Sequence, residues 1–312
     1  MLNENQKHYI QVLEYISQAE YDEINQLMDI CCKHESINLK LELDYKLHLS
    51  SLARKASDGH SGNKAEFLYY IGDILVAYLG ISCFDGVTGE LCGMTHPMYR
   101  KQGIFHRLLA LALNESQHSD FRQVLILADG SSESGMDFVR ANSATYAHSE
   151  YRMKRLSDAT AQSRSNSDQA SSEKITLRLA CKADEKDIAR YNAIFFNEER
   201  LEEETGDYKT TPLEDQPDKD KTYMIELNGC SIGKINVEFI DQYAFICGFG
   251  ILPEYRGRGY GRRGLNETLK LIEAQGIHTI ELDVVCTNSN ALGLYQSCGF
   301  VEQSVMNYYN LI

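Results

Sequence analysis

Leu252-Pro253-Glu254-Tyr255-Arg256-Gly257-Arg258-Gly259-Tyr260-Gly261 is a glycine-rich, arginine-containing stretch that follows an apolar run and precedes a helical pattern. Its glycines allow consecutive backbone N–H groups to turn toward one point, and the helix that follows adds its positive end. A loop of this kind suits a pyrophosphate. We therefore predict a binding site for a phosphate-bearing cofactor, made by Arg256, Gly257, Arg258, Gly259, Tyr260 and Gly261.

A weaker copy of this stretch lies at residues 96–105. Pro, Tyr, Arg and Gly recur there at one constant offset of 156 positions, which is half of the 312-residue chain: Pro97, Tyr99, Arg100 and Gly103 match Pro253, Tyr255, Arg256 and Gly259. Each copy follows an apolar run and precedes an amphipathic helical pattern. The pattern predicts a tandem repeat of one domain.

The length of the chain suits two domains of ordinary size. Residues 157–174 contain no large apolar side chain and many serines, so they are expected to form a linker. The predicted domains are therefore residues 1–156 and residues 175–312.

Composition excludes several classes of partner. The net charge is −14 and the isoelectric point about 5.1, which disfavours nucleic acid. We expect a soluble, cytoplasmic protein, since no signal peptide or membrane-length apolar stretch is apparent. The nine cysteines and nine histidines lack the spacings of metal ligands, so no metal is expected and the thiols are predicted to be reduced.

Hydrophobic periodicity predicts the same order of elements in both halves. In the second half we expect a strand, a helix, a meander of three antiparallel strands, a helix, a strand, a short helix and a final strand or strand pair: 175–179, 184–196, 222–227, 232–240, 243–251, 262–275, 278–286, 288–297 and 300–311. The first half is expected to have strands near 66–71, 74–84, 88–95 and 122–128 and a helix near 104–117. The fold class is α/β (α+β), with a mixed, mostly antiparallel sheet flanked by helices in each domain.

Two motifs resemble the GNAT N-acetyltransferase superfamily. The first is the pattern Arg or Gln, two residues, Gly, one residue, Gly or Ala, which is met by Arg256, Gly259 and Gly261. The second consists of Asn288, Ala291, Leu294, Tyr295, Gly299 and Phe300. The resemblance covers residues 175–312 well and residues 1–156 more weakly, so the chain resembles a tandem, two-domain member with a degenerate first domain.

The resemblance implies acetyl-CoA as co-substrate and direct transfer of its acetyl group to an amine. Four arginines within eight residues, Arg256, Arg258, Arg262 and Arg263, supply local positive charge for its phosphates. Strands 243–251 and 278–286 are expected to part beside the loop, with Ile251 as a main-chain contact and a nearby N–H donor for the oxyanion. Tyr295 is the expected general acid, with a packing role as the alternative. Asn288 and Asn290 are expected to touch the cofactor or to cap the short helix.

The sequence leaves the general base and the acceptor open. Glu238, Glu226, Asp283 and a water chain are all candidates for the base. Residues 198–220 carry ten acidic and three basic side chains, which suggests a cationic small-molecule or peptide amine, although a solvated surface explains the same count. The oligomeric state, a homodimer included, is also open.

The first domain departs from the motifs where they carry chemistry. At the repeat offset, Phe105, Ser132 and Val139 stand in place of Gly261, Asn288 and Tyr295. We therefore predict that the first domain is not the catalytic one. The remaining possible roles of the first domain are weak coenzyme A binding, completion of the acceptor cleft, or packing.

The sequence leaves two alternative functions. Gly259, Gly261 and Gly264 also spell a dinucleotide fingerprint, with Glu281 and Asp283 near the expected place of a ribose-binding acid. Pro253–Arg256 separate the preceding strand from the first glycine, which argues against that fold. The second alternative is a non-catalytic acyl-CoA sensor or scaffold.

Overall fold

The computed structural model describes residues 7–56, 65–119, 121–156, 173–196, 220–240 and 242–311. The chain divides into two compact units: the first is Met1–Glu150 with Ser304–Ile312, and the second is Tyr151–Gln303. The expected division at 156 and 175 differs from this, because residues 304–312 pack in the first unit and residues 151–156 in the second. Most of the predicted linker (157–172) and of the acidic segment (198–219) lies outside the described residues.

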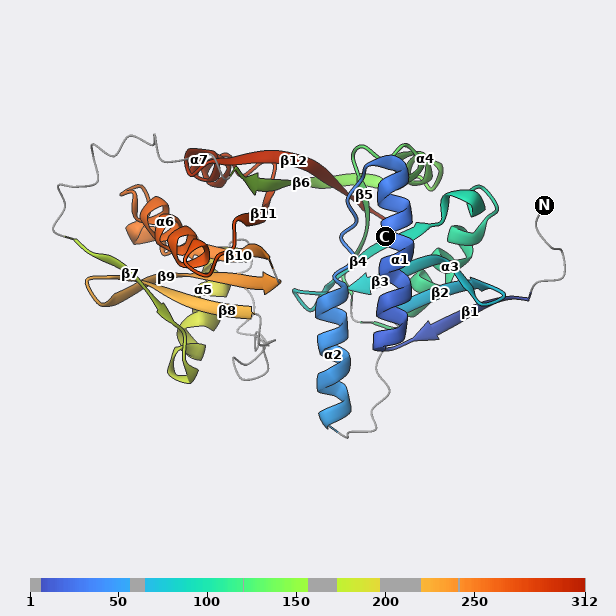
Figure 1. The fold of residues 1–312 in the computed structure, drawn as a ribbon, viewed down its shortest axis with the longest axis horizontal. Coiled ribbons are helices and arrows are strands. Elements are labelled where there is room, and N and C mark those ends of the chain that lie inside the picture. Colours follow the sequence, from blue (N-terminus) through green and yellow to red (C-terminus); the bar gives the residue numbers. More distant parts are fainter. Residues whose placement is uncertain are drawn as a thin grey trace. The chain divides into compact units, whose positions relative to one another are not determined.

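The first unit is a mixed sheet with helices on both faces (Figure 1). Its strands run in the order β1-β2-β3-β4-β5-β12, and all neighbours are antiparallel except β4 and β5. The strands are β1 (His8–Leu13), β2 (Glu66–Ile71), β3 (Ile74–Ser82), β4 (Thr88–Thr95), β5 (Gln123–Asp129) and the part of β12 (Phe300–Asn310) from residue 304 onward. The helices are α1 (Gln18–Glu35), α2 (Leu43–Ala56), α3 (Ile104–Ser116) and α4 (Glu133–Ala141).

Alternation along the strands explains why both faces of this sheet are covered. Phe67 and Leu79 pack with Leu108 of α3 in one core, whereas Leu68 and Tyr78 pack with Ile24 of α1 in another. Successive strand residues point to opposite faces, so each face needs its own helix. Every residue of β2 is buried as a result.

The second unit has the order β11-β10-β9-β8-β7, with β10 and β11 parallel and the other pairs antiparallel. The strands are β7 (Ile175–Leu179), β8 (Asp220–Leu227), β9 (Cys230–Ile240), β10 (Tyr243–Ile251) and β11 (Thr279–Val285); residues 151–155 of β6 (Thr145–Arg155) also belong here. The helices are α5 (Glu185–Phe196), α6 (Tyr260–Glu273) and α7 (Ser289–Ser297). Leu265, Leu269 and Ile272 of α6 pack into the main core, and Tyr191 of α5 packs into a smaller one with Met224.

The structure repeats at the offset found in the two loops. The short 3₁₀ helices Pro97–Tyr99 and Pro253–Tyr255, β5 and β11, and α4 and α7 each have bounds that differ by 156 positions at both ends. Helices α3 and α6 begin at the same offset. Both halves are therefore copies of one fold, as predicted, and equivalent positions can be compared directly.

Candidate functional site

The glycine-rich loop requires left-handed backbone at two positions. Gly257 has a φ of 73° and Gly259 a φ of 80°, and a side chain built at either position would meet nothing within 4 Å. Glycine is therefore favoured here by backbone conformation and not by lack of space. The open space beside both residues lets a ligand approach the backbone.

Helix α6 begins directly at this loop. Gly259 is its N-cap residue and makes no side-chain capping hydrogen bond, and the first turn contains no acidic residue. The first N–H groups of a helix have no partner within it, so this end is suited to an anion. The structure begins the helix at Tyr260, two residues earlier than predicted, because the left-handed turn at Gly259 ends the loop.

The predicted loop side chains have different roles. Arg256 Nε donates a hydrogen bond to the Ile251 carbonyl at 2.8 Å, which ties the loop to the end of β10. Tyr260 is buried, and its hydroxyl donates to Glu173 at 2.8 Å, so its side chain serves packing. Arg258 and Arg262 are exposed, and Arg262 Nε donates to Ser297 Oγ at 3.1 Å.

Strand β10 separates from β11 beside the loop. The parallel ladder pairs Tyr243–Ile246 with Thr279–Leu282 and ends there, although both strands continue. On its other edge β10 has an irregular register with β9 between Cys247 and Gly250, and Gly248 has a φ of 53°. A bulge bends the strand locally. The parting of the two strands agrees with the expectation from the sequence, and it frees backbone groups of residues 247–251 on the β11 side.

Tyr295 projects from α7 into the apolar part of the site. It is 8% exposed and lies near Phe249 and Phe300, with ring centroids 6.4 and 6.0 Å away. Burial raises the pKa of its phenol to about 12, and the neighbouring Cys247 thiol adds to the rise. The hydroxyl is therefore protonated at neutral pH and is able to donate a proton.

The two predicted asparagines lie at the exposed start of α7. Asn288 is the N-cap residue, and its Oδ1 accepts a hydrogen bond from the Ala291 N–H at 3.1 Å. Capping therefore accounts for Asn288 without a ligand. Asn290 is also exposed and lies in the first turn of α7.

Two of the three candidate bases are held in ion pairs. Glu226 binds Arg178 at 2.7 Å, and Asp283 accepts two hydrogen bonds from Arg152, at 2.5 and 3.1 Å. Glu238 lies beside the bulge instead, since its carboxylate accepts from the Cys247 thiol at 3.6 Å. Glu238 thus lies beside the bulge of β10, and Asp283 directly follows Leu282, the last residue of β11 that pairs with β10.

Sequence analysis missed Lys234. This β9 residue is only 2% exposed, and its Nζ donates to the Gly248 carbonyl at 3.0 Å and to Asn236 Oδ1 at 3.3 Å. Burial lowers its pKa to about 8. Lys234, Asn236 and Glu238 alternate with apolar residues, a pattern that is typical of a strand with one face in water. The signal available was a polar face on β9, the central strand of this sheet.

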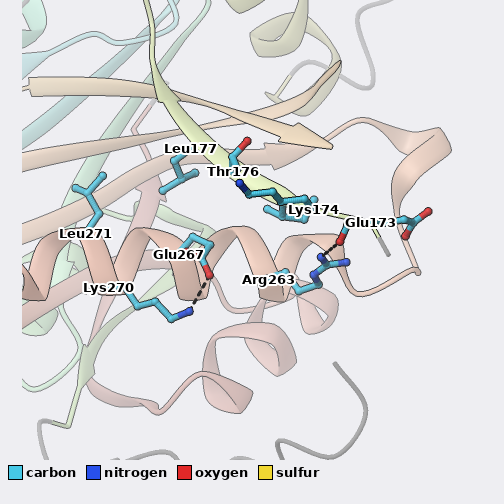
Figure 2. Close-up of a pocket in the computed structure, with 9 residues that line it drawn as sticks. Glu173, Lys174, Thr176, Leu177, Arg263, Glu267, Lys270 and Leu271 are labelled. Atoms are coloured by element: carbon cyan, nitrogen blue, oxygen red, sulfur yellow. Dashed lines mark hydrogen bonds and ion pairs between the residues drawn. The ribbon is translucent and has the colours of Figure 1, made fainter. Parts of the chain in front are cut away.

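A separate depression lies between β7 and α6 (Figure 2). It has a volume of about 790 Å³ and is lined by Lys174, Leu177, Arg263, Lys270 and other residues of these two elements. Arg263 donates to the Glu173 carbonyl at one end, and Lys270 pairs with Glu267 at 2.8 Å. Neither Tyr295 nor the loop glycines line it, so we do not place the candidate site there.

The described residues contain no cluster of three side chains suited to a metal. No helix among them is both long and apolar enough to cross a membrane.

One family model matches part of the second half of the chain. Residues 187–300 match the model of the acetyltransferase (GNAT) family. An uncharacterized N-acetyltransferase of Bacillus subtilis is 36% identical over 69 residues, which is 22% of this chain and 44% of that protein. The ribosomal protein bS18-alanine N-acetyltransferase of Escherichia coli K12 is 28% identical over 88 residues, which is 28% of this chain and 60% of that protein. The chain thus spans about half the length of these curated relatives.

Solved structures match over nearly the whole chain. A GCN5-related N-acetyltransferase from Sphaerobacter thermophilus superposes with a TM-score of 0.67 at 16% identity, covering 97% of this chain and 96% of the other. A tandem GNAT protein from the clavulanic acid biosynthesis pathway gives 0.65 at 13% identity, covering 98% and 99%. At these identities the likeness concerns the fold alone.

Proposed function

We propose that the chain is a tandem GNAT acetyltransferase whose second unit transfers the acetyl group of acetyl-CoA directly to an amine, because residues 187–300 match the GNAT family model and the fold resembles that of a tandem GNAT protein. The observation that carries this proposal is the parting of β10 from β11 directly beside the uncapped start of α6. Together these features offer backbone partners for a pantetheine chain and N–H groups for a diphosphate.

The chain provides residues suited to each part of the co-substrate. Backbone N–H groups from Gly257 to Arg262 would bind the diphosphate, and Arg258 and Arg262 would add positive charge. Residues 247–251, which end at Ile251, would pair with the pantetheine amides and offer an N–H to the thioester oxygen. Asn290, at the start of α7, is a further candidate contact.

The reaction joins an uncharged amine to the thioester carbon and breaks the carbon–sulfur bond. The amine loses a proton, and the departing thiolate gains one. Tyr295 is the proposed donor of that proton, because its buried phenol remains protonated at neutral pH. Its pKa of about 12 exceeds the value near 8.5 of an ordinary thiol, so proton transfer must accompany cleavage of the bond.

Glu238 is the proposed base for the amine. Glu238 lies at the bulge beside Cys247, where β10 leaves β11. A water chain ending on Glu238 serves the same purpose.

The acceptor is proposed as the amine of a small molecule or peptide. The acidic residues between 198 and 220 favour a cationic acceptor through long-range attraction. A cytoplasmic location and a homodimer remain predictions from the sequence.

The test is release of coenzyme A thiol from acetyl-CoA over a broad panel of amines. We expect turnover with at least one amine, loss of cofactor affinity in Gly259→Glu, and loss of turnover with retained affinity in Tyr295→Phe. Gly276→Ala, which alters another glycine with positive φ far from the loop in sequence, controls for general backbone effects. Tight binding without turnover for any amine would support a sensor instead, and unchanged affinity in Gly259→Glu would refute the proposed site.

A further inference from the structure

The first unit keeps the frame of the cofactor loop. Arg100 Nε donates to the Thr95 carbonyl at 3.0 Å, as Arg256 does to Ile251, and Gly103 has a φ of 74°. Ser132 caps α4 with its side chain, as Asn288 caps α7. The backbone that would hold a diphosphate is therefore present in both units.

A carboxylate of the chain itself lies beside this frame in the first unit. Glu35, the last residue of α1, forms an ion pair with Arg100 and accepts hydrogen bonds from Ser132 Oγ at 2.7 Å and Ser134 Oγ at 3.2 Å. Its side chain is 16% exposed. Burial would raise the pKa of Glu35, but the two hydroxyls and Arg100 outweigh it and hold the pKa below its usual value.

The repeat shows which residues of the second unit correspond to the hydrogen-bond partners of Glu35. Arg100, Ser132 and Ser134 occupy the positions of Arg256, Asn288 and Asn290 in the second unit. Glu35 thus spans the loop and the start of α4 through the equivalents of Arg256 and Asn288, which hold the loop and the start of α7 in the second unit, and of Asn290, a candidate cofactor contact. It satisfies their donors with negative charge, as an anionic ligand would.

Two aromatic side chains lie next to the loop of the first unit. Phe105 packs edge-on against Phe138, with ring centroids 4.8 Å apart. The equivalent pair in the second unit is Gly261 and Leu294, where a Cβ built on the glycine would lie 3.6 Å from Leu294. The first unit therefore has two aromatic rings at the positions where the second unit has a glycine and a leucine at ordinary contact distance.

Side chains of the first unit also fill the surface of β2 and β3, the strands equivalent to β8 and β9. Lys46 of α2 is 6% exposed and binds Glu66 at 2.7 Å, and the Tyr78 hydroxyl donates to the same carboxylate. A side chain at Gly80 would lie 2.6 Å from Lys46 Nζ, so that position is closed by the lysine. In the second unit, Thr222, Lys234 and Asn236 take the places of Glu66, Tyr78 and Gly80.

We propose that the first unit is occupied by its own side chains, with Glu35 in the place of the cofactor's anionic group, so that one chain binds one coenzyme A, in the second unit. This inference rests on the proposed function. Because Glu35 is tethered at the site, a free anion must compete with a partner of high effective concentration. The Phe105–Phe138 pair is bulkier than Gly261 and Leu294, and we expect it to hinder the ligand sterically.

Titration calorimetry of the full chain with coenzyme A measures the stoichiometry. We expect one site per chain in the wild type and none in Gly259→Glu. In a Gly259→Glu chain that also carries Glu35→Ala and Phe105→Gly, binding should return at one site per chain. Asp29→Asn, an exposed acidic residue on the same helix, is the matched control and should restore nothing. Circular dichroism checks that each variant is folded.

The outcomes test two separate claims, the inference about the first unit and the proposed function. Two sites in the wild type, or no return of binding in the folded triple variant, would overturn the inference. If the triple variant does not fold, the milder Glu35→Gln, Phe105→Leu pair in the same background replaces it, with the same criterion. Absence of any coenzyme A binding by the wild type would refute the proposed function instead.

Discussion

Tyr295 has a buried phenol in apolar surroundings. The role of its hydroxyl can therefore be tested separately from the packing of its ring. Tyr295→Phe keeps the ring between Phe249 and Phe300 and removes only the group assigned to protonate the thiolate. We expect kcat to fall by about a hundredfold or more, while coenzyme A affinity and the unfolding midpoint stay close to those of the wild type. Steady-state kinetics with calorimetry check this. A kcat within twofold of the wild type would assign Tyr295 to packing.

Lys234 is a residue whose burial predicts a pH dependence of stability. Its pKa is lowered from 10.5 to about 8, so between these values the unfolded chain binds a proton that the folded chain does not. Stability therefore carries a penalty on the order of 3 kcal/mol below pH 8, which is relieved as pH rises toward 10.5. Lys234→Met should be more stable than the wild type at pH 7, by a margin that shrinks toward pH 10.

Urea unfolding at pH 7, 8, 9 and 10 measures that margin. Taking the difference between variant and wild type cancels the cysteines and tyrosines that do not interact with Lys234; Cys247 does interact with it, but burial raises the pKa of that thiol above this range. Lys270→Met, at an exposed position of α6, is the control and should show a constant margin. A constant margin for Lys234→Met would mean that the lysine is not desolvated in solution.

At the scale of elements, the bulge of β10 determines where that strand parts from β11. Gly248 has a φ of 53°, and a Cβ there would lie 2.9 Å from both Lys234 Nζ and Asn236 Nδ2. Gly248→Ala should therefore lower the stability by about 1–2 kcal/mol through backbone strain alone, with a further loss from the contacts. Gly293→Ala on α7, where a Cβ meets nothing within 4 Å, is the control and should be neutral or stabilising. Thermal unfolding compares the two, and equal midpoints would contradict the bulge.

The elements that sequence analysis predicted are those with a local signal. The loop, α6 and the meander follow from glycine spacing, helical periodicity and tight turns, and the structure has them within a few residues. Helices α1 and α2 were not predicted, because neither has a counterpart at the repeat offset. Lys234 was missed because strand alternation does not say whether a polar face meets water or a functional site. The partner strand of β12 was also beyond reach, since pairing between distant segments leaves no local pattern.

At the scale of the whole molecule, the last strand joins the sequence halves. Residues Met306–Asn310 of β12 pair with Leu125–Asp129 of β5, so the end of the chain completes the sheet of the first unit. Tyr308 is 1% exposed there, and its hydroxyl donates to Glu150 at 2.6 Å. Residues 1–156 alone would thus lack a strand that covers β5 and would expose its edge.

Cleavage between the halves tests this arrangement. After cutting at a protease site inserted following residue 165, the two fragments should elute together in size-exclusion chromatography, because β12 stays bound to β5. Removing residues 304–312 before cleavage should cause aggregation, since β5 loses its antiparallel partner, whereas residues 151–155 still pack in the second unit and should keep the fragments together. Truncating residues 1–6 is the control for loss of a terminus and should leave the fragments together. If the fragments of the untruncated chain separate and each remains folded, the halves are autonomous and the assignment of residues 304–312 to the first unit is wrong.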